Sequence, residues 1–342
     1  MKNKKIYIRL DANYERGMGH LFRMLALEGL FVKKNYKVRF IIRDNEISTK
    51  ILKEKKQFFM SFPEDYSELQ IIKNAIKDKS NNPDIWIFDI LSTKADWIKY
   101  IQSKGIKVVC FDDTGGGLEF ADLLINAIVS CWGEYNIKKS NKNIVFDIRY
   151  TIVHPDVFKY RNIRTISSKK ILKIAISMGG SDTNASTILI ASSLSELSPE
   201  SYKFHFFTGP HFLHTKELKN IIQDIHCECS VKLFAKNLYK ELNDADIVIC
   251  NGGVTLFEVC TMGLPAIAFA NENHEKKTIS YLQKNNLCCY LGSYQDTAPD
   301  EIFLKLNNIL TQRENLNKVS KKSYNFFSEQ GIKLCLNKII DL

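Results

Sequence analysis

A histidine near the amino terminus stands where a side chain could act on a bound ligand. The run Gly17-Met18-Gly19-His20 separates a β-branched and aromatic stretch, residues 6–10, from a segment in which leucines recur at helical spacing. Such a strand–turn–helix junction is a usual place for ligands in parallel sheets, and glycines let the backbone come close to them. The N–H groups at the helix start would favour a phosphate or a developing anion. We therefore expect His20 to lie beside bound negative charge; the alternative is a helix-capping or surface histidine.

The second half of the chain contains a similar turn, Gly179-Gly180-Ser181, after the predicted strand of residues 171–176. The glycines and the following helix start offer N–H groups to a diphosphate. Ser181 and its neighbours Asp182 and Thr183 are also residues that cap helices without any ligand. The sequence predicts a diphosphate contact here and leaves simple capping as the alternative.

A third glycine-rich turn, Gly252-Gly253, follows the predicted strand of residues 247–250. It leads into a segment with Thr255 and Glu258, which we expect to be the first turns of a helix. A carboxylate at the position of Glu258 can accept hydrogen bonds from both hydroxyls of a ribose. A glutamate near a helix start is also favourable for the helix dipole alone, by up to about 1 kcal/mol.

These turns require strands to position them, and short apolar stretches do alternate with helical segments in both halves of the chain. That alternation is typical of a parallel sheet covered by helices. The predicted strands are residues 6–10, 38–42, 85–88, 108–111 and 123–125, then 172–177, 204–207, 231–234, 247–250 and 266–269.

A polar segment without clear periodicity, near residues 155–170, separates the two series. We expect an N-terminal Rossmann-like domain, residues 1–160, and a C-terminal Rossmann-like domain, residues 161–342. The segment 304–327 is expected to be helical, and the sequence leaves open whether this last helix crosses back to the first domain.

The composition describes a globular protein: 45% of the 342 residues are hydrophobic and 25% are charged. No apolar stretch is long enough to span a membrane and the amino terminus lacks a signal-peptide pattern, so we expect a cytoplasmic protein. The nine cysteines form no paired CxxC pattern, so we expect reduced thiols and no metal site. The net charge of +10 comes from dispersed lysines, which suits an anionic small molecule or loose association with a membrane surface, but no nucleic acid. We expect a monomer.

Four groups of residues together resemble the GT-B fold, and within it the relatives of the lipid II-forming N-acetylglucosaminyltransferase. A closer resemblance is to the UDP-sugar hydrolase family of pseudaminic acid biosynthesis, which acts on UDP-2,4-diacetamido-2,4,6-trideoxy-β-L-altropyranose. It covers almost the whole chain. The residues that carry it are Arg9, Asp11, Gly17, Gly19, His20 and Arg23; residues 111–113; residues 177–182; and residues 252–258 with Asn273.

The resemblance implies an α/β, GT-B protein with two Rossmann-like domains facing a cleft. It further implies hydrolysis of the UDP-sugar to UDP and free sugar with inversion, and no metal ion or other cofactor. His20 would be the general base with help from Asp11, and Asn273 would complete the catalytic group. The expected substrate- and UDP-binding residues are Arg9, Gly17, Gly19, Arg23, Asp112, Gly179, Gly180, Ser181, Phe234, Gly252, Gly253, Thr255, Glu258 and His274.

Three departures from the family pattern concern the sugar more than the nucleotide. Asp89-Ile90-Leu91 stands where the family has Asp-His-Tyr, Asn273-His274 replaces Asn-Gln, and Asp113 is followed by the unusual run Thr114-Gly-Gly-Gly117. UDP recognition is therefore better supported than the identity of the sugar. Glycosyl transfer from a UDP-linked amino sugar is the alternative function, and a binding module without chemistry is the third. A dehydrogenase is disfavoured because Gly17-Met-Gly-His20 lacks the third glycine of that fingerprint.

Overall fold

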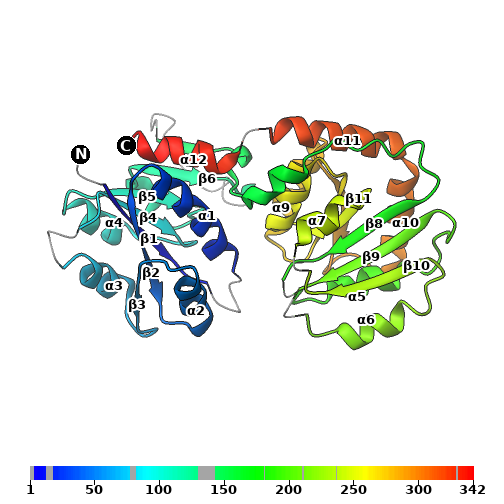
Figure 1. Ribbon diagram of the computed structural model, residues 1–342, viewed down its shortest axis with the longest axis horizontal. Coiled ribbons are helices and arrows are strands. Elements are labelled where there is room, and N and C mark those ends of the chain that lie inside the picture. Colours follow the sequence, from blue (N-terminus) through cyan, green and yellow to red (C-terminus); the bar gives the residue numbers. More distant parts are fainter. Residues whose placement is uncertain are drawn as a thin grey trace. The chain divides into compact units, whose positions relative to one another are not determined.

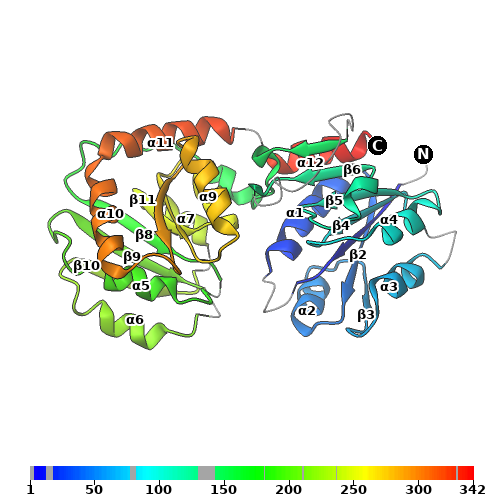
Figure 2. The ribbon, with the colours of Figure 1, turned by 180° about the vertical axis from the view of Figure 1, so that it is seen from behind.

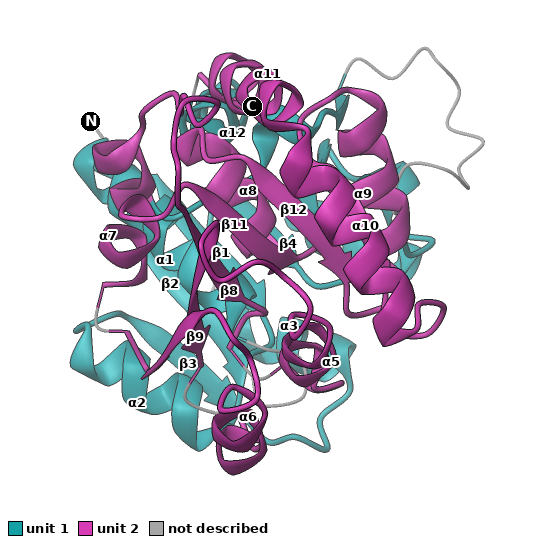
Figure 3. Ribbon diagram, turned by 90° about the vertical axis from the view of Figure 1, so that its right-hand side faces the viewer, with its two compact units in different colours: residues 1–154, 329–342 teal, residues 155–328 magenta. Residues whose placement is uncertain are grey.

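The computed structural model describes residues 4–12, 18–77, 82–129, 143–180, 182–209, 212–235, 237–328 and 330–342. The described chain divides into two compact units: residues 1–154 with 329–342, and residues 155–328 (Figure 3). Each unit has its own parallel sheet and core, so each is described by itself.

Unit 1 is a seven-stranded sheet in the order β3-β2-β1-β4-β5-β6-β7, in which every neighbouring pair is parallel. Residues alternate between the two faces along each strand: Ile6, Ile8 and Leu10 of β1 lie in one core cluster, and Tyr7 lies in the other. The strands are β1 (Lys5–Leu10), β2 (Lys37–Arg43), β3 (Phe59–Phe62), β4 (Ile85–Asp89), β5 (Lys107–Phe111), β6 (Leu123–Asn126) and β7 (Ile144–Phe146).

Helices cover both faces of this sheet (Figure 1). One face packs against α1 (Gly19–Lys33), α2 (Glu46–Glu54) and the last helix of the chain, α12 (Gly331–Ile340). The other face packs against α3 (Glu68–Ala75) and α4 (Ala95–Gln102). Short 3-10 turns lie at Leu118–Phe120 and Ile148–Tyr150.

Unit 2 begins with a 3-10 segment, Pro155–Tyr160, and is a six-stranded parallel sheet in the order β10-β9-β8-β11-β12-β13 (Figure 2). Its strands are β8 (Leu172–Ser177), β9 (Tyr202–Thr208), β10 (Glu228–Leu233), β11 (Ile247–Asn251), β12 (Ala266–Ala270) and β13 (Cys289–Ser293). Its helices are α5 (Ser186–Ser192), α6 (Thr215–Ile221), α7 (Leu238–Asn243), α8 (Val254–Met262), α9 (Glu275–Lys284), α10 (Pro299–Thr311) and α11 (Arg313–Phe326).

The two parallel sheets confirm the predicted α/β class. The sequence predicted ten strands, and all ten are present, with bounds that shift by a few residues. It missed β3, β7 and β13, and it predicted one helical segment where α10 and α11 are separate helices. None of the helices in the described ranges is long and apolar enough to cross a membrane.

Candidate functional site

Three aspartates meet at one edge of the sheet of unit 1. The strand order reverses between β1 and β4, and ligands of open parallel sheets bind at the carboxyl ends of the strands where such a reversal occurs. Asp11 follows β1, Asp89 is the last residue of β4, and Asp112 follows β5. α1 begins at the same edge, with His20 as its second residue.

The imidazole of His20 is held by Asp89, whose Oδ1 lies 2.9 Å from the ring Nδ1. Arg23, one helical turn further along α1, also binds both oxygens of Asp89, with its Nε 2.9 Å from Oδ2. Its Nη1 donates to Asp112 Oδ2 at 2.6 Å. These contacts fix the orientation of the His20 ring. In the tautomer whose Nδ1–H donates to the carboxylate, Nε2 keeps a lone pair.

The charges around His20 favour its acting as a base. Burial alone would raise the pKa of Asp89, but the charges of Arg23 and His20 and their hydrogen bonds outweigh it and hold that pKa well below its usual value. The Asp89 carboxylate, which touches the ring, can therefore stabilise an imidazolium. The side chain of His20 is 22% exposed, so a reacting group can reach it.

A second charged cluster fixes Asp11. Arg9 lies fully buried on β1, and its guanidinium binds Glu68 of α3 (Nε–Oε1 2.6 Å) and Asp11 (Nη1–Oδ1 2.6 Å). Arg43, at the end of β2, binds Glu68 as well (Nη2–Oε2 3.3 Å). Two guanidinium groups thus offset two carboxylates, as buried charges require.

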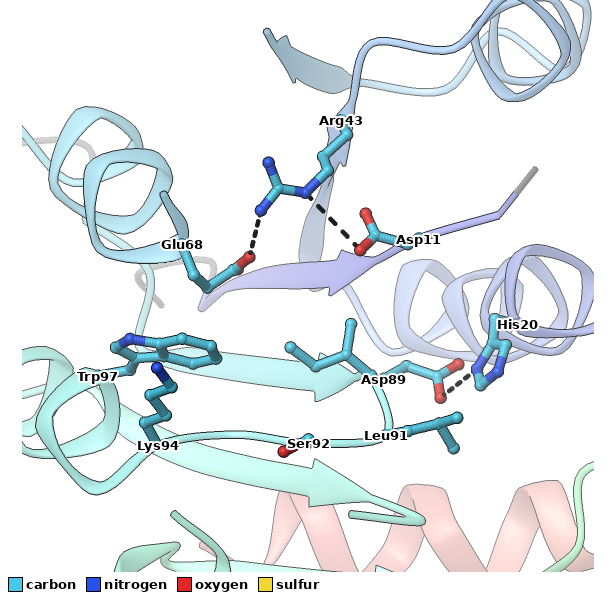
Figure 4. A pocket seen from close by; sticks show the side chains of 10 residues that line it. Asp11, His20, Arg43, Glu68, Asp89, Leu91, Ser92, Lys94 and Trp97 are labelled. Carbon is cyan, nitrogen blue, oxygen red and sulfur yellow. Dashed lines mark hydrogen bonds and ion pairs between the residues drawn. The ribbon is translucent and has the colours of Figure 1, made fainter. Parts of the chain in front are cut away.

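Both clusters contribute to the wall of one pocket in unit 1, shown in Figure 4. Its volume is about 640 Å³, within the usual range of small-molecule sites. The lining residues are Asp11, His20, Arg43, Glu68, Asp89, Ile90, Leu91, Ser92, Lys94 and Trp97.

The structure thus places some predicted unit 1 residues at the pocket and others behind it. His20 and Asp11 line the pocket, whereas Arg9 and Asp112 are buried. Asp112 Oδ1 also accepts hydrogen bonds from the backbone N–H groups of residues 127 and 128. Gly19 is the first residue of α1, and Gly17 lies outside the described residues.

Sequence reasoning did not assign a role to Asp89 or Glu68. A signal existed for Asp89, because a charged residue at the carboxyl end of an apolar strand in a parallel sheet is a candidate site residue. Nothing in the sequence pairs Glu68 with Arg9, which lies 59 positions away.

In unit 2 the strand order reverses between β8 and β11, and the two predicted glycine turns follow these strands. Asn251, the last residue of β11, lies between the turns. A Cβ added at Gly179 would lie 3.4 Å from its Nδ2, and one at Gly253 would lie 3.3 Å from it. Gly179 has a φ of +87°, a conformation that favours glycine. Gly252 is required by packing, since a Cβ there would come within 2.7 Å of Glu275 in α9.

Gly180 faces open space: a Cβ added there would have no atom within 4 Å. Gly209, after β9, supports the turn from the other side, because a Cβ at that position would lie 2.1 Å from the carbonyl oxygen of Gly180. The backbone at Gly180 is thus accessible on one side and closely backed by Gly209 on the other.

Glu258 lies in α8, where it is buried, and its Oε1 accepts a hydrogen bond from the Tyr239 hydroxyl at 2.7 Å. Burial, reinforced by the negative charge of Glu258, raises the pKa of Tyr239 and keeps that hydroxyl protonated. Tyr239 is a contact that sequence reasoning missed. Thr255 is the second residue of α8, and the side chain of Phe234, just after β10, is 64% exposed.

The remaining predicted residues of unit 2 are less well defined as a site. Asn273 and His274 are exposed in the loop between β12 and α9. Asp182 caps α5 by accepting hydrogen bonds from the backbone N–H groups of Ser186 and Thr187, at 2.9 and 2.8 Å, which is the capping alternative for this turn. Ser181 lies outside the described residues.

Within the part of the chain that the structure describes, no group of three or more His, Cys, Asp or Glu side chains is arranged to hold a metal ion. The described cysteines are free thiols, and all of them except Cys229 are buried. Burial raises the pKa of Cys110 and Cys250 well above the ordinary thiol value, so neither is a reactive thiolate.

Residues 174–335 match the family model of the glycosyltransferase family 28 C-terminal domain. The spore coat polysaccharide biosynthesis protein SpsG of Bacillus subtilis is 26% identical over 86% of this chain and 85% of its own length. An uncharacterised protein of Methanocaldococcus jannaschii, MJ1062, is 27% identical over 82% of this chain, which spans only 58% of that relative. The UDP-N-acetylglucosamine--N-acetylmuramyl-(pentapeptide) pyrophosphoryl-undecaprenol N-acetylglucosamine transferase of Campylobacter jejuni is 32% identical over 30% of this chain and 32% of its own length.

Among solved structures, MurG of Acinetobacter baumannii is similar over 99% of this chain and 100% of its own, with a TM-score of 0.73 and 15% identity. This likeness concerns the fold, which is the GT-B fold expected from the sequence. The chain therefore has the GT-B fold, and residues 174–335 are similar to the family 28 C-terminal domain.

Proposed function

We propose that this protein is a glycosyltransferase that uses a UDP-linked amino sugar as its donor. The observation that carries the proposal is the His20–Asp89 pair at the switch point of unit 1, beside a pocket large enough for a small-molecule substrate. The similarity to a transferase whose name specifies UDP-N-acetylglucosamine supports this class of donor.

We assign the nucleotide to unit 2. The diphosphate would approach the backbone at Gly180 and the Gly252-Gly253 turn, where N–H groups can stabilise the charge that gathers on the leaving group. Glu258, held by Tyr239, would accept the ribose hydroxyls, and the exposed ring of Phe234 offers a surface on which the uracil could stack.

We assign the proton transfer to unit 1. As the acceptor oxygen attacks the anomeric carbon, its proton passes to Nε2 of His20, and the new C–O bond forms as the bond to the diphosphate breaks. The bonding electrons leave with UDP, and attack from the opposite face inverts the anomeric centre. Asp89 stabilises the resulting imidazolium, and such base catalysis is worth about 10²- to 10⁴-fold in rate. Asp11, fixed by Arg9, offers carboxylate oxygens to the same pocket as hydrogen-bond acceptors.

Hydrolysis of UDP-2,4-diacetamido-2,4,6-trideoxy-β-L-altropyranose, as in pseudaminic acid biosynthesis, is the second candidate. The resemblance of the His20 and Gly252–Glu258 segments to that hydrolase family favours it. The chemistry at His20 is the same, with water in place of the acceptor hydroxyl.

Proton and phosphorus NMR can follow UDP and sugar signals when the protein is mixed with UDP-N-acetylglucosamine or the diacetamido sugar nucleotide. Spectra of each mixture are recorded without and with added sugar acceptors, for the wild type and for His20→Ala. We expect UDP release and a new glycoside only with acceptor present, and their loss in the variant. UDP and free sugar from the diacetamido donor alone would establish the hydrolase instead. No turnover of either donor under any condition would overturn both functions.

A further inference from the structure

The pocket of unit 1 has a second wall that the proposed chemistry does not use. It is formed by residues 90–97, and Figure 4 shows Trp97 and Lys94 at the far end from His20. The side chain of Leu91 is 57% exposed, while Trp97 is half-buried. Trp97 packs partly against the core of unit 1, and it lines the pocket together with the exposed Leu91, so the two side chains offer apolar surface to a bound molecule.

This wall is rigidly built by the run that follows Asp113. The backbone N–H of Thr114 donates to the carbonyl of Leu91 at 2.8 Å, and that of Gly117 donates to the carbonyl of Thr93 at 3.1 Å. Asp113 Oδ1 accepts the backbone N–H of Thr93 at 3.0 Å. The two segments that depart from the family pattern, residues 90–91 and 114–117, are thus bonded neighbours.

The glycines of that run are required by this contact. A Cβ at Gly115 would lie 2.2 Å from the carbonyl oxygen of Thr93, and a Cβ at Gly117 would lie 2.2 Å from the hydroxyl of the same residue. Larger residues at either position would push the wall out of place. The unusual glycine run therefore serves to hold the segment that carries Lys94 and Trp97.

The charges of the pocket are not evenly paired. Arg43, Glu68 and Asp11 lie in one ion-pair cluster, and Asp89 is bound to His20 and Arg23. Lys94 alone among the lining cations has no carboxylate within ion-pair distance in the described residues. Its ammonium group lies 5.7 Å from the centre of the Trp97 ring, so cation and aromatic face form one surface.

We propose that Lys94 and Trp97, on the wall of residues 90–97, bind an anionic carbohydrate as the acceptor of the transfer reaction. This inference rests on the proposed function and names its acceptor class. A sugar ring presents an apolar face that packs on an indole, and a carboxylate or phosphate on the sugar would pair with Lys94. The volume of about 640 Å³ lies within the range of small-molecule sites, so the pocket has room for such an acceptor.

Saturation-transfer NMR with the full chain tests the site directly, using glucuronic acid, glucose 1-phosphate and neutral glucose as probes. We expect the two anionic sugars to bind more tightly than glucose. Lys94→Ala should abolish that preference, a loss of about two- to fivefold in affinity for an exposed ion pair. Trp97→Ala should lower the affinity for all three sugars by about tenfold, and Trp97→Phe should restore part of that affinity.

Lys99→Ala is the matched control. Lys99 is also an exposed lysine over an aromatic ring, 4.1 Å from the centre of Phe120, but it does not line the pocket. The Lys99→Ala variant should bind the three sugar probes with wild-type affinity. Equal binding by wild type, Lys94→Ala and Trp97→Ala, or no saturation transfer to any probe, would overturn the inference.

Calorimetry of UDP binding by the same wild-type sample separates this inference from the proposed function. UDP binding without sugar binding would refute the acceptor site and leave the donor assignment intact. Sugar binding that depends on Trp97, without any binding of UDP, would refute the proposed transferase and leave an anionic-sugar site.

Discussion

The proposed base, His20, depends on residues that lie far from it in sequence. Asp89 is 69 positions away, yet it fixes the tautomer of the imidazole, and Arg23 fixes Asp89 in turn through a bidentate contact. Such partners act by orienting the group that reacts. Their removal should affect turnover more than substrate binding.

Asp89→Asn tests this dependence. The amide keeps the shape of the carboxylate but can donate to Nδ1, which would place the proton on Nε2 and remove the base. The lost negative charge also makes an imidazolium less favourable. We measure kcat with the donor that the NMR experiment identifies. We expect kcat to fall by about 10²- to 10⁴-fold, while the affinity for UDP stays unchanged. Steady-state kinetics and calorimetry measure the two quantities.

Asp96→Asn, an exposed aspartate in the first turn of α4, is the control and should keep wild-type kcat. If Asp89→Asn turned over like the wild type, His20 could not be acting through this carboxylate.

The sequence predicted part of this arrangement. His20 could be named because it follows a glycine turn next to a strand, and Asp11 and Arg23 were named through the resemblance to a known family. Glu68 and Trp97 could not, since each reaches the pocket from a helix whose own sequence contains no ligand-binding pattern. Charged pairs such as Arg9 with Glu68 are set by the register of strands and helices, which a single sequence does not give.

At the scale of elements, the glycine turns of unit 2 make different demands on their residues. Gly252 and Gly209 are closely contacted by other parts of unit 2, whereas Gly180 meets open space. Space beside a glycine that no protein atom uses is where a ligand can come close to the backbone.

Gly180→Ala separates the two roles. An added methyl group has no neighbour in the protein, so we expect the melting temperature to stay within about 2 °C of wild type. A diphosphate at the same turn would meet this methyl group, and UDP affinity should fall about tenfold or more. Calorimetry and thermal unfolding monitored by circular dichroism give both values.

The control for this variant is Gly29→Ala, in the middle of α1, which also has open space beside it. It should leave UDP affinity unchanged and stabilise unit 1 by about 0.5–1 kcal/mol through helix propensity. Unchanged UDP affinity in Gly180→Ala would remove this turn from the nucleotide site.

The strands that sequence analysis missed share one feature: β3, β7 and β13 are all edge strands. β3 has four residues and β7 has three, and most of them are only partly buried, so each is too short to stand out as the apolar run of a central strand. β13 contains Gly292 and pairs with β12 through a register shift. Phe234 was predicted as the end of a strand but follows β10 with a φ of +53°, which turns it out of the sheet.

For the whole molecule, the two units repeat one plan, with the candidate residues of each at the reversal of its strand order. The chain also returns to its first unit at the end. α12 packs on the same face of the unit 1 sheet as α1, and it contributes Ile332, Cys335, Leu336 and Ile339 to that core. The sequence predicted a helical segment only for residues 304–327, which belongs to unit 2, so α12 and its return to unit 1 follow from the complete packing.

Because α12 belongs to the core of unit 1, a destabilising substitution in α12 should lower the stability of that unit. Leu336 is 5% exposed, and Leu336→Ala should cost about 2–5 kcal/mol of the unfolding free energy of unit 1. Hydrogen exchange measured by mass spectrometry should show faster exchange in β1 and β6, with β8 and β11 unchanged. Leu304→Ala, at a helical leucine of α10 that is 65% exposed, should change neither unit by more than about 0.5 kcal/mol. Faster exchange in unit 2 alone would mean that the last helix stabilises the other unit, and the assignment of residues 329–342 to unit 1 would be wrong.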